Sequence, residues 1–275
     1  MQPPAGPVSY LDAKTARAYE QTLGAPILLG THPAFGNGTS PYPTLLFIPG
    51  AGGTISGYQA YLSEFASHGY AVVGIDYPGE APYTALPYGA PGVDGIRDIG
   101  SLTSVDFHHI YEYRLADLAA VLNPFGGLLP ALIAQYGAPF NTTHYAVLGH
   151  SMGGAASAGA MISAPGLYRA GSNLDGTFQH LVKPDPTNST AVNGTAHLDY
   201  MDTPLGFDLL RAREGGVVPP AALGALGTIA GKRVTEVVTG LLLSFFREFV
   251  GSGAGVESVD AFIARTPKAF VMAEK

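Results

Sequence analysis

The sequence contains no cysteine, few charged residues and no long hydrophobic run. Without cysteine, disulfide bonds, thiolate metal sites and a cysteine nucleophile are excluded. No apolar run reaches the roughly 18 residues that a membrane span requires, so we expect no transmembrane segment. Charged residues make up 13% of the chain, the formal net charge is −7, and no block of lysine or arginine occurs. These features argue against nucleic acid and against an anionic membrane surface as partners.

The chain is nevertheless rich in apolar residues, which make up 47% of its 275 residues. Apolar runs at 44–48 and 71–76 flank a segment with helical spacing at 58–68, and strand, helix and strand in about 35 residues form a βαβ unit. A chain of this length can fold around one large core. We therefore predict a single α/β domain over residues 1–275, with a mostly parallel sheet covered by helices on both faces.

Further elements are predicted from the same periodicities. Helices are expected over 110–122, 128–136 and 234–250, and strands before residue 149 and over 170–175. The segment 77–104 is rich in proline, glycine and tyrosine and lacks periodicity, which is typical of a lid or a binding loop. We expect Tyr83 and Tyr88 of this loop to line the substrate pocket.

One motif indicates the chemistry. Gly149-His150-Ser151-Met152-Gly153 follows an apolar strand and precedes a run of small residues. This pattern is typical of a nucleophile elbow, in which glycines make room for a sharp turn between a strand and a helix. A chance match is the alternative in a chain with 37 glycines, but chance does not supply both the strand and the helix. Ser151 is the predicted nucleophile, and His150 is expected to point away into the fold.

Serine reacts only when an imidazole accepts its proton and an acid orients that imidazole. On this type of sheet the three residues follow in the order serine, acid, histidine. Asp175 ends the strand after Ser151, and His197 lies in the next turn, so these are the predicted acid and base. His180 and Asp185 remain the alternatives for the same roles.

The negative oxygen that forms during attack needs two backbone N–H donors. The amide of Met152, directly after the nucleophile, is the first candidate. The second is expected from the glycine-rich loop 49–53, where we choose Ala51. This loop lacks the Gly-Lys-Ser/Thr ending of a phosphate-binding loop, so nucleotide binding is not indicated.

Five stretches together resemble one known family. They are Phe47–Gly53 with Tyr58, Ala66–Asp76, Gly149–Gly154, Asn173–Thr177, and Gly194–His197 with Asp202. They are similar to the platelet-activating-factor acetylhydrolase-like branch of the α/β-hydrolases, and cutinase-type polyester hydrolases look like more distant relatives. The most specific feature is the acid only 24 positions after the serine. The resemblance implies an α/β-hydrolase fold and hydrolysis of short-chain or oxidised acyl esters, with no cofactor and no metal.

The chain departs from that branch between the acid and the histidine. Asp175 and His197 are 22 positions apart, whereas the branch ordinarily places a further strand and helix there. A parallel crossover needs at least about 10 to 12 residues in addition to the strand itself. Either the sheet is one strand short at this point or the chain is a trimmed variant of the branch, and the short connection bears on whether His197 reaches Ser151.

These observations together predict a serine carboxylic-ester hydrolase that acts through an acyl-enzyme on small-molecule or lipid esters with short acyl chains. One alternative is a lipase or cutinase-like polyester hydrolase. Another is a catalytically silent binding protein of the same fold, because fold alone does not determine function. The sequence does not indicate an oligomeric state.

Four glycosylation patterns favour secretion. They begin at Asn37, Asn141, Asn188 and Asn193, each in a loop-like setting. The first seven residues contain no basic and apolar signal segment, so we expect them to be a mature terminus with an added methionine. The predicted location is extracellular.

Overall fold

The central element of the computed structural model is a parallel β-sheet. The structure describes residues 41–86, 90–176, 190–215, 225–251, 255–266 and 269–272. Four strands form the sheet in the order β2-β1-β5-β6, with all neighbours parallel. The strands are β1 (Tyr42–Ile48), β2 (Ala71–Gly74), β5 (Phe140–His150) and β6 (Tyr168–Leu174). Phe47 of β1 pairs with Gly74 on one side and Leu148 on the other.

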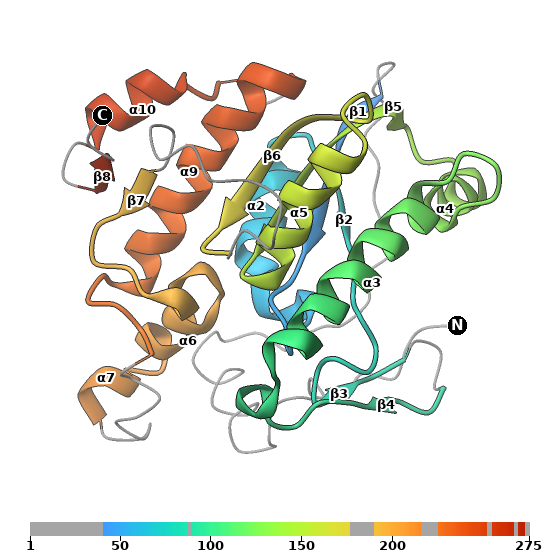
Figure 1. Cartoon of the computed structure of the whole chain (residues 1–275). Coiled ribbons are helices and arrows are strands. Elements are labelled where there is room, and N and C mark those ends of the chain that lie inside the picture. Colours follow the sequence, from blue (N-terminus) through green and yellow to red (C-terminus); the bar gives the residue numbers. More distant parts are fainter. Residues whose placement is uncertain are drawn as a thin grey trace.

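Helices cover both faces of this sheet (Figure 1). One face packs against α2 (Gln59–Ser67), α9 (Gly231–Val250) and α10 (Val259–Arg265), and the other against α3 (Ser104–Leu122), α4 (Leu128–Tyr136) and α5 (Met152–Ser163). Leu45 and Phe47 face the first group, and Leu46 and Ile48 face the second. Successive strand residues point to opposite faces, and a parallel strand covered on both sides is apolar throughout. The predicted fold class, a mostly parallel sheet between two helical layers, is confirmed.

Helix α3 begins six residues earlier than predicted, at Ser104 rather than at residue 110. Thr103 and Asp106 form a capping box in which each side chain bonds the backbone of the other residue. This box satisfies two amides that would otherwise lack partners at the helix start. The prediction was wrong because the early turns carry His108, His109 and acidic residues, which obscure the apolar stripe.

The segment 77–104 is not wholly irregular, in contrast to the prediction. It contains a small antiparallel hairpin, β3 (Tyr83–Thr84) and β4 (Val93–Asp94), followed by the 3-10 turn η3 (Ile99–Ser101). The ring of Tyr83 lies against Gly92, where any Cβ would collide with it. The glycine that suggested a loop thus permits this packing. Tyr88 lies outside the described residues.

The chain after Asp175 leaves the main sheet, as far as the described residues extend. Strand β7 (Thr190–Val192) pairs antiparallel with β8 (Phe270–Met272) in a separate two-stranded sheet. Residues 190–196 therefore add no strand to the main sheet. Residues 177–189 lie outside the described residues, so a missing strand stays a prediction. The remaining elements are η1 (Ile55–Tyr58), η5 (His197–Tyr200), α6 (Thr203–Leu209) and α7 (Ala212–Gly215).

None of the helices in the described part of the chain is both long and apolar enough to cross a bilayer.

Candidate active site

Ser151 lies on the sharp turn between β5 and α5. Its backbone has φ 54° and ψ −122°, a conformation that residues with a side chain rarely adopt. A Cβ on Gly149 would collide with the backbone of Gly153, and one on Gly153 would collide with the carbonyl of Ile48. The turn can therefore form only with glycines on either side of the serine. The Ser151 amide donates to the carbonyl of Leu174 at 2.9 Å, which ties the turn to β6.

Asp175 lies on a second strained turn that packs directly on the first. Its φ is also 54°, and the side chain of Asn173 holds the turn by bonding both the amide of Gly176, at 2.8 Å, and its carbonyl, at 3.0 Å. A Cβ on Gly176 would collide with the carbonyl oxygen of Ser151. The predicted acid and the predicted nucleophile are thus on adjoining turns at the carboxyl ends of β5 and β6.

His197 reaches Asp175 in spite of the short connection. Its Nδ1 lies 2.6 Å from Asp175 Oδ2, and the two side chains are 48% and 52% exposed. A carboxylate can only accept here, so Nδ1 carries the proton and Nε2 is left free to accept one. Among the described residues, Ser151 Oγ makes no hydrogen bond with His197, and this bond often tightens only when substrate binds.

The buried side chain of Asp199 holds the turn that carries His197. Asp199 has no exposed surface, and its Oδ2 accepts from the amides of Ala196 at 2.7 Å and Gly227 at 2.8 Å. Backbone amides bonded to a buried charged oxygen are strong anchors. Asp199 therefore holds the histidine turn against the segment before α9.

His150 is buried, as predicted, with 2% of its surface exposed. Its Nδ1 lies 2.9 Å from the hydroxyl of Tyr58, and its Nε2 lies 2.9 Å from the backbone carbonyl of His197. Burial, followed by the nearby His197, lowers the pKa of His150 to about 4, and burial raises the pKa of Tyr58 to about 12. Both side chains are therefore neutral near pH 7.

The glycine-rich loop after β1 lies against the nucleophile. A Cβ on Gly50 would be 3.3 Å from Ser151 Cβ. The Gly50 amide donates to the Tyr58 hydroxyl at 3.0 Å, and its carbonyl accepts from Gly53 at 3.0 Å. Within the described residues, the amides of Ala51 and Met152 donate to no other group. Neither predicted oxyanion donor is therefore taken by another described group, and their role stays a prediction.

Sequence reasoning missed Arg114, which is completely buried. Its Nη1 donates to the carbonyl of Pro49 at 2.6 Å, its guanidinium pairs with Glu80, and it lies 4.5 Å from the ring centre of Tyr77. A charged residue in an amphipathic helix is ordinarily read as solvent-facing. Only the three-dimensional contacts show that Arg114 holds the loop beside Ser151.

The remaining predicted site residues are not brought to the serine by any described contact. Tyr83 is 45% exposed and packs within its own hairpin. Tyr88, His180 and Asp185 lie outside the described residues. Their roles stay predictions.

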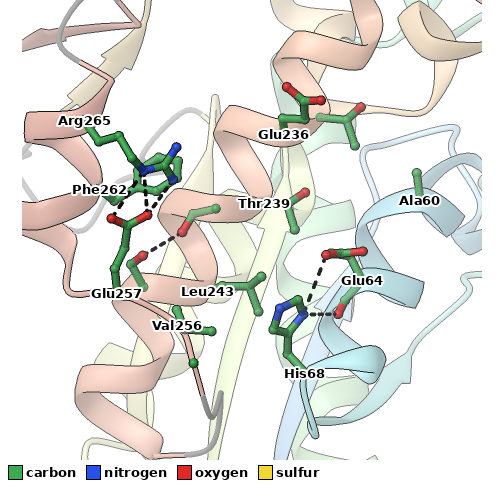
Figure 2. A pocket seen from close by; sticks show the side chains of 14 residues that line it. Ala60, Glu64, His68, Glu236, Thr239, Leu243, Val256, Glu257, Phe262 and Arg265 are labelled. Atoms are coloured by element: carbon green, nitrogen blue, oxygen red, sulfur yellow. Dashed lines mark hydrogen bonds and ion pairs between the residues drawn. The ribbon is translucent and has the colours of Figure 1, made fainter.

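A cavity of about 730 Å³ lies elsewhere, between α2, α9 and α10. Figure 2 shows Glu64 and His68 on its α2 side and Thr239 and Leu243 on α9. Its lining includes none of the predicted catalytic residues. Across the described part of the chain, no cluster of three or more histidine or acidic side chains is placed to hold a metal ion.

Comparison with one solved structure supports the fold. The ferulic acid esterase from Streptomyces cinnamoneus is 20% identical, with a TM-score of 0.65 over 99% of this chain and 86% of that chain. A carboxylesterase from Nitrososphaera gargenis is 17% identical, with a TM-score of 0.32 over 82% of this chain and 63% of that one. A search of curated proteins found no match.

The sequence also matches a family model. The model of the Alpha/beta hydrolase family matches residues 45–271. This range includes the predicted nucleophile, acid and base. Because the match spans most of the sequence, the chain belongs to the alpha/beta hydrolase family.

Proposed function

We propose that the protein is a serine carboxylic-ester hydrolase in which Ser151 is the nucleophile, His197 the base and Asp175 the orienting acid. One observation carries the proposal: a serine on a strained elbow adjoins a turn whose carboxylate bonds the histidine Nδ1 at 2.6 Å. In the neutral imidazole this hydrogen bond places the proton on Nδ1, so Nε2 is the nitrogen that can accept a proton, as general-base catalysis requires.

The reaction follows from these positions. Ser151 Oγ attacks the ester carbonyl while its proton passes to His197 Nε2, and the negative oxygen accepts from the amides of Ala51 and Met152. When this tetrahedral intermediate collapses, the alcohol leaves with the proton from Nε2, and the acyl group remains on Ser151. Water then attacks the acyl carbon as Nε2 removes its proton. The bond between the acyl carbon and Ser151 Oγ breaks, Nε2 returns the proton to Oγ, and the carboxylic acid departs. Asp175 stabilises the imidazolium at both stages.

A labelling experiment tests the nucleophile. A fluorescent organophosphonate should modify the parent protein at Ser151, because only an activated serine reacts with it. Ser151→Ala should abolish labelling and reduce hydrolysis of nitrophenyl acetate by about 10³-fold or more, to the residual that the oxyanion hole and binding supply. Ser163→Ala is the matched control, since its hydroxyl only bonds the carbonyl of Gly159 at 2.8 Å. An unlabelled, folded parent would support a silent binding protein instead.

The proposed substrates are short-chain acyl esters of the platelet-activating-factor acetylhydrolase type, either small molecules or lipids. The resemblance in the sequence supports this choice. Nitrophenyl esters from acetyl to palmitoyl would test it, with a fall in kcat/KM beyond butyryl expected. A maximum at long chains, or release of soluble products from a polyester film, would support the lipase or cutinase-like alternative. Methyl ferulate belongs in the same panel because a similar structure is a ferulic acid esterase.

We also propose that the protein is secreted. Two of the four glycosylation patterns fall on described residues, and Asn193 is exposed. Asn141 lies at the irregular amino end of β5, where its side-chain oxygen accepts from the amide of Thr143 at 2.9 Å. Expression through a eukaryotic secretory route should give a mass that falls when N-glycans are removed. A mass equal to that of the bare polypeptide would contradict the glycosylation.

A further inference from the structure

A buried chain of hydrogen bonds runs from the glycine-rich loop to the backbone of His197. It consists of the Gly50 amide, the Tyr58 hydroxyl, the His150 imidazole and the His197 carbonyl, at successive distances of 3.0, 2.9 and 2.9 Å. We propose that Tyr58 and His150 are positioning residues. They hold the glycine-rich loop, which carries the proposed oxyanion donor Ala51, at a fixed distance from the catalytic histidine. This inference rests on the proposed function, because it assigns His197 as the base.

The direction of every bond in the chain is determined. The His197 carbonyl can only accept, so His150 Nε2 carries the proton and His150 Nδ1 is an acceptor. The Tyr58 hydroxyl must then donate to Nδ1, and its oxygen lone pair accepts the Gly50 amide. The Gly50 amide only donates, the His197 carbonyl only accepts, and the Tyr58 hydroxyl and the neutral His150 ring each donate once and accept once, so no alternative pattern satisfies all four groups. A protonated His150 would break the chain at Tyr58.

Burial gives the chain its strength. Tyr58 is 1% exposed and His150 is 2% exposed, and hydrogen bonds away from water are stronger and costly to leave unmade. Burial also lowers the pKa of His150 to about 4, so the ring stays neutral across the range in which esterases commonly work. Tyr58 is packed at 4.7 Å between ring centres on Phe47 of β1, which keeps it from rotating.

The catalytic pair itself is far less constrained. The side chains of His197 and Asp175 are each about half exposed, and exposed ion pairs contribute little rigidity. The imidazole rings of His150 and His197 lie 4.6 Å apart between centres, so a shift of the His197 backbone changes where Nε2 points. His150 directly precedes Ser151 in the sequence. Its hydrogen bond to the His197 carbonyl therefore fixes the position of the base relative to the nucleophile.

Two substitutions at His150 separate positioning from simple packing. The amide of His150→Gln can place a nitrogen near Nε2 and keep the donor to the His197 carbonyl. The side chain of His150→Asn reaches only the Nδ1 position and loses that donor. We expect His150→Asn to lower kcat by about 10- to 100-fold with little change in KM, because a misplaced catalytic group costs rate more than binding. His150→Gln should recover at least about fivefold of that loss.

Tyr58→Phe tests the other end of the chain. It removes both the acceptor of the Gly50 amide and the donor to His150, and kcat should fall about 10-fold or more. Tyr145→Phe is the matched control: Tyr145 is equally buried, at 2% exposure, and its hydroxyl bonds the carbonyl of Thr142 near the amino end of β5. This control should keep the parental kcat. The combined Tyr58→Phe and His150→Asn variant should lose less than the product of the two single effects, since both break one chain.

The outcomes separate this inference from the proposed function. A parent that reacts with an organophosphonate, together with folded Asn and Gln variants of equal kcat, would overturn the positioning role alone. A parent that does not react would overturn the proposed function. If the variants do not fold, a measurement on the parent protein tests the inference instead. Long-range proton–nitrogen NMR on histidine-labelled parent should show His150 with its proton on Nε2 at pH 7. A proton on Nδ1 of His150 would contradict the proposed series of hydrogen bonds.

Discussion

The guanidinium of Arg114 donates to the carbonyl of Pro49 at 2.6 Å, although the two residues are 65 positions apart. The same side chain reaches the carbonyl of Gly50 at 3.4 Å and pairs with Glu80. The carbonyl of Gly50 and the amide of Ala51 belong to one planar peptide unit, so holding the carbonyl also fixes the direction of the Ala51 N–H. Arg114 thus fixes the orientation of the proposed oxyanion donor through the carbonyls that precede it.

Replacing Arg114 with methionine should therefore affect both stability and catalysis. The change leaves Glu80 and the carbonyl of Pro49 without their partner in a buried site, while the carbonyl of Gly50 keeps its bond from Gly53. Breaking a buried ion pair typically costs about 3–5 kcal/mol. We expect the free energy of unfolding in urea to fall by about that amount. The kcat on a short nitrophenyl ester should fall in the fraction that remains folded.

The controls use an exposed pair and a compensating change. Arg97→Met breaks a pair with Asp94 in which both side chains are more than 70% exposed, so it should cost less than about 1 kcal/mol. Adding Glu80→Gln to Arg114→Met removes the unpaired charge and should restore part of the lost stability. Equal losses for Arg97→Met and Arg114→Met would contradict the assigned role of the buried pair.

Asp175→Asn should reduce kcat by about 10³- to 10⁴-fold. The asparagine amide can donate to Nδ1 of His197, which favours the wrong tautomer and places the proton on Nε2. Stability should change by less than about 1 kcal/mol, because the pair is half exposed. Steady-state kinetics and urea unfolding of the same preparation check both statements. A variant that keeps more than a tenth of the parental kcat would show that another acid, such as Asp185, acts instead.

Much of the fold was predictable because its signals are local. The apolar runs that became β1 and β2 are covered on both faces, so few of their positions are polar. Helix α4 has the predicted bounds because Gly137 ends it in a left-handed conformation. The start of α3 was missed because the histidines and acidic residues of its early turns obscure the apolar stripe. The short β3–β4 pairing was missed because two-residue strands carry no periodicity.

Some residues of the candidate site were also predictable from local sequence signals, and others were not. The turn around Ser151 was visible because tight backbone contacts admit only glycine at fixed spacing. Asp175 and His197 could be placed by chain order, and they do meet. Arg114 could not be predicted, since its role depends on bonds to residues about 65 positions away. The partner of His150 is a backbone carbonyl, which every residue has, so no sequence pattern could indicate it.

Tyr83→Ala tests whether the β3–β4 hairpin borders the substrate pocket. Apolar pocket contacts discriminate substrates by about 1–3 kcal/mol, so the ratio of kcat/KM between acetyl and longer esters should change by about 10-fold or more. Tyr83 is half exposed and packs on Gly92, so the loss of stability should stay near 1 kcal/mol. Tyr113→Ala, at an exposed position on α3, should leave the ratio unchanged. An unaltered acyl profile in Tyr83→Ala would place the pocket elsewhere.

The pH dependence of stability should carry a specific contribution from His150. Its pKa is about 4 in the folded protein, against an ordinary value of 6.5. The unfolded chain therefore binds this proton first, so the stabilising contribution is complete above pH 6.5 and is lost as the pH falls from 6.5 toward 4.

Between pH 7 and pH 5 the loss attributable to His150 should be about 2 kcal/mol, measured as the free energy of unfolding in urea. Asp76 and Asp202 act in the opposite direction, because burial raises the pKa of each carboxyl. The comparison with His150→Gln cancels their contribution, since both proteins contain them. The parent should therefore lose about 2 kcal/mol more than the variant over this interval, and equal losses would mean that His150 is not held neutral by its burial.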